Sequence, residues 1–149
     1  MMHFAPRADA AHILCVEEDP VQRKLLQACL DVAGADGLFA GNASQALALF
    51  RRHTVDLVLM DFDFHAAAEL AAFETMRKQG AVPILAVTDN ECRWTEEDYR
   101  EAGFIGLYVK PIEPSRLLSC MDTALRDAGL APLLCDPRTF HDAGFSLLH

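Results

Sequence analysis

The stretch Val55–Asp63 constrains the fold more than any other part of the sequence, because an apolar run ends there in two nearby carboxylates. A run so rich in branched aliphatic residues predicts a strand that is buried on both faces. Such strands belong to parallel sheets, whose ligands bind at the carboxyl ends of the strands. Asp61 would stand at that edge, with Asp63 just beyond it. One acidic residue after a strand is more often an ordinary loop residue, so the other strand ends decide between the two interpretations.

Short apolar runs alternate with helical patterns five times between residues 11 and 128. Asp19 before Pro20 is a typical helix start, and Thr95 with Asp98 resembles a capping box. This alternation predicts an α/β fold, a (βα)5 doubly wound parallel sheet with helices on both faces. The predicted strands are residues 11–16, 37–40, 55–61, 83–87 and 105–109. The predicted helices are residues 20–33, 42–50 (capped by Asn42 or Ser44), 65–79, 95–102 and 114–127.

The length of 149 residues suits one domain with a single core. We expect residues 1–10 to be a flexible leader, residues 11–128 the domain, and residues 129–149 a short C-terminal extension. Asp136 before Pro137 is another helix start, so this tail has room for one short helix. The apolar residues of the tail either pack against the parent domain or form a dimer or partner contact.

The net charge of −9, from 13 basic and 22 acidic residues, bounds the possible partners. Nucleic-acid binding needs clustered Lys and Arg, so we expect no direct contact with nucleic acid or with an anionic membrane. No apolar run reaches the length of a membrane span, and the first residues have no signal-peptide pattern. Five cysteines without a CxxC pair indicate reduced thiols in a cytoplasmic protein.

Polar side chains follow four of the five predicted strands, and in a parallel sheet they converge on one edge. They are Glu17, Glu18 and Asp19 after the first strand, Asp61 and Asp63 after the third, Thr88 and Asp89 after the fourth, and Lys110 after the fifth. Crowded carboxylates repel one another unless they are protonated or bind a cation, and Mg²⁺ prefers such oxygen ligands. An Asp beside Mg²⁺, a hydroxyl and an ammonium group is a site for aspartyl-phosphate chemistry.

These residues, in this order, resemble the receiver domain of two-component response regulators. The resemblance rests on four segments, Ile13–Pro20, Val55–Asp61, Pro83–Thr88 and Gly106–Pro111, and it covers roughly residues 11 to 128. It implies a flavodoxin-like sheet with strand order 2-1-3-4-5.

The resemblance also implies a role for each matching residue. Asp61 would accept a phosphoryl group from a phosphohistidine. Lys110 would pair with that group, and Thr88 would donate a hydrogen bond to it and relay the change. The Lys110–Pro111 peptide bond would be cis.

The metal ligands follow from the same resemblance. Glu18 would bind Mg²⁺ directly and Glu17 would do so through a water molecule. Asp61 and the backbone carbonyl of Asp63 would complete the protein ligands.

Several positions depart from the family pattern. Both residues of the acidic pair are Glu, where the family usually has at least one Asp, and Asp89 replaces the usual small residue after Thr88. Leu107 stands at the position of the aromatic switch residue, and Tyr108 follows on the opposite side of the strand. The segment 64–69 also lacks the usual Met-Pro and Gly. We therefore expect altered metal binding and a non-standard coupling to the output.

The leading hypothesis is a single-domain receiver that is not an enzyme in the ordinary sense and signals through protein contact. Its partners would be a histidine kinase or a histidine phosphotransfer protein, a downstream protein target, and, through a homodimer, a second copy. The alternative is a pseudo-receiver, an interaction module that works without phosphorylation. A third and weaker alternative is a DxD-type phosphatase built on Asp61 and Asp63, although the later acidic motif of that family is missing.

Overall fold

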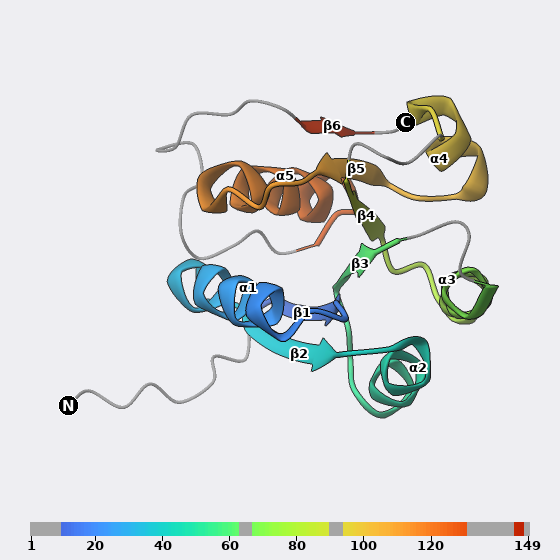
Figure 1. Cartoon of the computed structure of the whole chain (residues 1–149), viewed down its shortest axis with the longest axis horizontal. Helices are drawn as coiled ribbons and strands as arrows, with labels where there is room; N and C mark the ends of the chain where they lie inside the picture. Colours follow the sequence, from blue (N-terminus) through green and yellow to red (C-terminus); the bar gives the residue numbers. More distant parts are fainter. Residues whose placement is uncertain (1–9, 63–66, 90–93, 131–144, 148–149) are drawn as a thin grey trace.

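The computed structural model describes residues 10–62, 67–89, 94–130 and 145–147. A central sheet is covered by helices on both faces (Figure 1). The strands are β1 (His12–Val16), β2 (Asp36–Ala40), β3 (Leu57–Asp61), β4 (Ile84–Thr88), β5 (Gly106–Val109) and β6 (Phe145–Leu147). The helices are α1 (Pro20–Ala33), α2 (Ala43–Arg52), α3 (Ala67–Gln79), α4 (Glu96–Ala102) and α5 (Pro114–Asp127).

The strand order is β2-β1-β3-β4-β5-β6, and the first five strands are parallel. The predicted order 2-1-3-4-5 is thereby confirmed. The sixth strand was not predicted: Phe145–Leu147 pairs antiparallel with β5 and opposes Gly106, Leu107 and Tyr108. The predicted short helix of the tail falls on residues 131–144, which lie outside the described part of the chain.

Each buried strand contributes to two cores, because alternate side chains point to opposite faces of a sheet. On β3, Leu57 and Leu59 face α1 and α5, whereas Val58 and Met60 face α2, α3 and α4. This burial on both faces explains why the predicted strands are nearly continuous apolar runs.

The helix ends follow the signals in the sequence. Asp19 caps α1 by accepting from the Val21 amide at 2.9 Å, and Asn42, not Ser44, caps α2. The capping box of Thr95 and Asp98 at α4 is also confirmed. Within the described helices, none combines the length and the apolar character that crossing a membrane requires.

Candidate functional site

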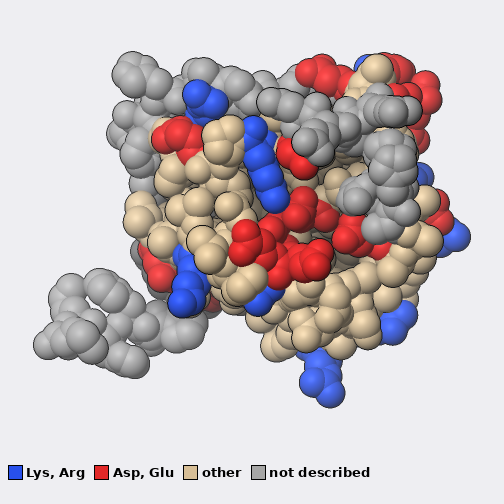
Figure 2. Space-filling view, in the orientation of Figure 1, with Lys and Arg blue, Asp and Glu red and all other residues tan. Residues whose placement is uncertain are grey.

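A hollow at the carboxyl ends of β1 and β3 brings together most of the polar residues singled out in the sequence. Its volume is about 490 Å³, and it is lined by Glu17, Glu18, Asp19, Pro20, Gln22, Asp61 and Lys110. Acidic side chains gather at the centre of this face, with basic side-chain atoms directly against them (Figure 2). The predicted convergence is therefore present for the residues that follow β1 and β5 and for Asp61 of β3, whereas Thr88 and Asp89 at the end of β4 are not among the lining residues.

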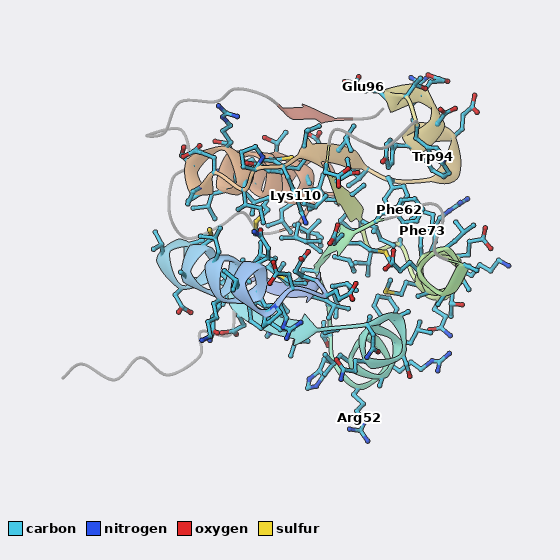
Figure 3. All side chains as sticks on the ribbon, viewed as in Figure 1. Arg52, Phe62, Phe73, Trp94, Glu96 and Lys110 are labelled. Carbon is cyan, nitrogen blue, oxygen red and sulfur yellow. The ribbon has the colours of Figure 1, made fainter. Side chains whose placement is uncertain are left out.

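Lys110 joins two carboxylates in this hollow. Its Nζ donates to Asp61 Oδ2 at 3.3 Å and to Glu17 Oε2 at 3.5 Å. Glu17 is only 3% exposed, whereas about a third of the Asp61 side chain is open to solvent. Lys110 reaches this position from the end of β5 and points toward β1 and β3 (Figure 3). Asp61 is thus the acid of the pair that an incoming molecule can reach.

The Glu17 carboxyl group holds its proton more tightly than a free glutamate side chain does. Burial raises the pKa of Glu17, and a hydrogen bond to Asp61 and the negative charge of Asp61 raise it further, to about 7. The positive charge of Lys110 and the hydrogen bond from the Asp19 amide lower the pKa of Glu17 but do not offset this rise. Burial lowers the pKa of Lys110, but the charges of Asp61 and Glu17 outweigh this effect, so its pKa is raised and it remains an ammonium ion.

The start of α1 fixes the acidic pair. Arg23 Nη1 donates to the backbone carbonyls of Glu17 at 2.7 Å and of Glu18 at 2.9 Å. The Asp19 amide donates to Glu17 Oε1 at 3.3 Å. These contacts turn Glu17 inward, while Glu18 is exposed at the rim of the hollow. The division of direct and water-mediated metal binding between Glu18 and Glu17 stays a prediction.

Arg23 was not singled out from the sequence. An Arg on the first turns of a helix is usually a solvated surface residue, so no local pattern marks it. Only the fold shows that its guanidinium holds the loop after β1.

The residues expected to sense the phosphoryl group are buried close by. Thr88 ends β4 and is 5% exposed, and its hydroxyl donates to the carbonyl of the exposed Asp89 at 3.3 Å. Leu107 is buried in the core under α4, and Tyr108 is buried in the core under α5. The Lys110–Pro111 peptide bond is cis, as expected. Asp63 lies outside the described residues.

The donor chemistry of the hollow fits a hydrated Mg²⁺ ion. Within the ranges the structure describes, no group of three Asp, Glu, His or Cys side chains is arranged to hold a metal ion by itself. However, Mg²⁺ typically takes one or two protein carboxylates and fills its remaining positions with water and phosphate oxygens. Glu17, Glu18 and Asp61, which line the hollow, can supply such carboxylates.

The fold and the site define a known class of protein. The sequence model of the response regulator receiver domain family matches residues 13–122, well over half of the sequence. The chain therefore belongs to the response regulator receiver domain family, which works in two-component signalling.

Relatives of known role agree with this assignment. The polar-differentiation response regulator DivK of Brucella anthropi is 27% identical over 119 residues, which cover 78% of this chain and 97% of DivK. The transcriptional regulatory protein AruR of Pseudomonas aeruginosa is 33% identical over 119 residues, which cover 76% of this chain and 49% of AruR.

The solved structures agree on the fold. A CheY-like receiver domain protein from Methanospirillum hungatei JF-1 superposes with a TM-score of 0.73 at 21% identity, and the match covers 80% of this chain and 97% of that one. At this identity the likeness supports the architecture alone.

Proposed function

We propose that this receiver domain accepts a phosphoryl group on Asp61 from a phosphohistidine and passes the signal on through protein contact. The observation that carries the proposal is the position of Lys110, whose ammonium group lies within 3.5 Å of both the Glu17 and the Asp61 carboxylates. A carboxylate that is partly open to solvent and faces a fixed cation is suited to hold a phosphoryl group.

In the proposed step, Asp61 is the nucleophile. One carboxylate oxygen forms a bond to phosphorus while the phosphorus–nitrogen bond of the phosphohistidine breaks, and the imidazole keeps the electron pair and takes up a proton. Lys110 already lies beside this oxygen and can follow the negative charge onto the phosphoryl group. The Thr88 hydroxyl, which donates to the Asp89 carbonyl, can rotate to donate to the same group.

Asp61 and Glu18 would hold Mg²⁺ at this site directly, together with the backbone carbonyl of Asp63, and Glu17 would do so through a water molecule. When bound, Mg²⁺ would neutralise charge on the phosphoryl oxygens. Glu17 must be ionised to take part in metal binding, and Arg23 keeps the backbone of the acidic pair in place.

The proposed partners are a histidine kinase or a histidine phosphotransfer protein as the donor and a protein target as the receiver of the signal. The match to nearly the full length of DivK supports signalling through contacts of the receiver domain itself. A homodimer is a further possible output contact for the C-terminal segment.

The test is incubation with acetyl phosphate and Mg²⁺, followed by intact-protein mass spectrometry. We expect the mass of one added phosphoryl group in the wild type and none in Asp61→Asn. Asp36→Asn, at the far end of β2 from the hollow, is a matched control and should be modified like the wild type.

The alternative function is a receiver-fold interaction module that works without phosphate. The exposed Asp89, one residue beyond Thr88, favours it because this carboxylate adds negative charge where an anionic donor would approach. An unmodified wild type under the same conditions, with partner binding that is unchanged in Asp61→Asn, would favour this module.

A further inference from the structure

Directly after Asp61, the chain passes from the charged hollow into an aromatic cluster. We define this cluster as Phe62, Phe73, Trp94, Tyr99 and Phe104. Four of the rings are at most 2% exposed, and Trp94 is half-buried. Phe62 and Phe73 lie between the sheet and α3, and Trp94 lies beside α4 (Figure 3).

Phe62 contacts every other ring of the aromatic cluster. Its ring centroid lies 4.9 Å from Phe104, 5.4 Å from Trp94, 6.2 Å from Phe73 and 6.3 Å from Tyr99. All four separations fall in the range of about 4.5–7 Å in which aromatic pairs attract one another. The Phe62 amide donates to the Val87 carbonyl at 3.1 Å, so the residue is also tied to β4.

Two of these rings determine how α4 begins. Thr95 is the N-cap of α4, so Trp94 stands just before the cap and Tyr99 is the fourth helical residue. Their centroids are 5.2 Å apart, which is the hydrophobic staple that fixes the angle at which a chain enters a helix. Phe62 therefore packs on both members of the staple.

The residue at the usual position of the aromatic switch, Leu107, cannot carry a signal by turning a ring. Leu107 is an aliphatic residue, and it is buried in the same core as the aromatic cluster. It has no ring to turn between an inner and an outer position. A signal from Asp61 to α4 therefore needs another residue that contacts both Asp61 and the start of α4. Phe62 meets both conditions, because it is covalently joined to Asp61 and packs on Trp94 and Tyr99.

We propose that Phe62 couples the phosphoryl state of Asp61 to the start of α4, through its contacts with Trp94 and Tyr99. A small shift of the backbone at Asp61 displaces the Phe62 ring. Because close-packed rings cannot deform continuously, the staple and the first turn of α4 then take a second arrangement. This inference rests on the proposed phosphoryl transfer to Asp61.

The experiment uses beryllium fluoride with Mg²⁺ as the phosphoryl mimic and reads α4 in two ways. Trp94 is the one tryptophan of the sequence, so its emission reports on the staple directly. Hydrogen exchange of the α4 amides reports on the helix. Binding of the mimic is followed separately by the fluorine resonance of the bound species.

In the wild type we expect the mimic to change Trp94 emission and to change α4 exchange rates about fivefold or more, as typical allosteric couplings do. In Phe62→Leu we expect the mimic to bind with both signals unchanged. Phe73→Leu is the matched control, since it removes a ring of the same cluster that is not joined to Asp61. Phe73→Leu and Leu107→Ala should keep both responses. Should Phe62→Leu fail to fold, Phe62→Met, whose flexible thioether side chain fills irregular gaps in a core, takes its place.

Two results would overturn the coupling: a full response in a folded Phe62 variant, or a wild type that binds the mimic while Trp94 and α4 stay unchanged. Failure of the wild type to bind the mimic or to accept phosphate from acetyl phosphate would instead overturn the proposed function.

Discussion

Asp61 and Phe62 are neighbours in the chain, yet their side chains lie in opposite kinds of environment. Asp61 opens into a hollow of acids around one ammonium group, where a proton, a metal ion or a phosphoryl group can change the charge. Phe62 is enclosed by four aromatic rings, which interact with it through packing and not through charge. The proposed coupling depends on this difference, because a change of charge at Asp61 would reach the ring packing through a single peptide unit.

The largest expected effect is the loss of stability when a ring of the aromatic cluster is removed. Phe104→Ala removes a ring that contacts Phe62, Phe73 and Tyr99, so we expect the free energy of unfolding to fall by about 3–5 kcal/mol in a urea titration. Phosphoryl uptake per folded molecule should stay close to that of the wild type. Val32→Ala, at a position 66% exposed, is the control and should cost less than about 0.5 kcal/mol. Equal losses in the two variants would contradict the packing described here.

The next largest effect is on the rate of phosphoryl uptake and comes from the hollow. The core should stay intact. Lys110→Met removes the cation shared by Glu17 and Asp61, so we expect the rate of phosphoryl uptake from acetyl phosphate to fall by about 100-fold. The mass gain over time measures this rate. Lys24→Met, on the exposed side of α1, is the matched control. A wild-type rate in Lys110→Met would show that the ammonium group has no part in the transfer.

A third prediction concerns pH. Glu17 has a pKa of about 7 in the folded protein against an ordinary value of 4.5, so the folded state holds this proton more tightly than the unfolded state does. Its stabilising contribution is complete below about pH 4.5 and is lost as the pH rises through about 7. Without divalent cations, we expect the free energy of unfolding of the wild type to fall by about 1–2 kcal/mol between about pH 5 and 8 through this group. Glu17→Gln should not show this fall. The figure is discounted for screening by solvent in the hollow.

Thermal unfolding of the wild type and Glu17→Gln in a chelator measures this difference. Glu74→Gln, at an exposed position on α3, is the control and should keep the wild-type slope. Identical slopes in the wild type and Glu17→Gln would contradict the raised pKa of Glu17.

The smallest effect is at the start of α4. Thr95→Ala removes the hydroxyl that accepts from the Asp98 amide, and we expect a loss of about 1 kcal/mol of stability in a urea titration. Thr95→Ser keeps the oxygen and should retain most of the stability. Equal losses of stability in Thr95→Ala and Thr95→Ser would contradict the capping role of the hydroxyl oxygen.

The sequence was sufficient to predict the sheet and the meeting of Glu17, Asp61 and Lys110. Buried parallel strands are visible as apolar runs, and their carboxyl ends must share one edge. The inward turn of Glu17 could not be predicted, because it depends on Arg23 and on backbone amides. The full burial of Tyr99 in α4 could not be predicted either, because rings from distant segments surround it.

The β6 strand was also beyond local reasoning. A three-residue strand at Phe145–Leu147 has no periodicity to detect, and its pairing partner in β5 is about 40 residues earlier in the chain. Such a pairing depends on long-range contact and not on local propensity.

We propose that Asp61, and not another acid of the hollow, takes the phosphoryl group. The direct measurement is to treat the protein with acetyl phosphate and Mg²⁺, reduce the acyl phosphate with borohydride, and map the peptides by mass spectrometry. Reduction converts a phosphorylated Asp to homoserine, so we predict homoserine at position 61. Homoserine at Asp63 or Asp89 instead, or at no position, would contradict the account.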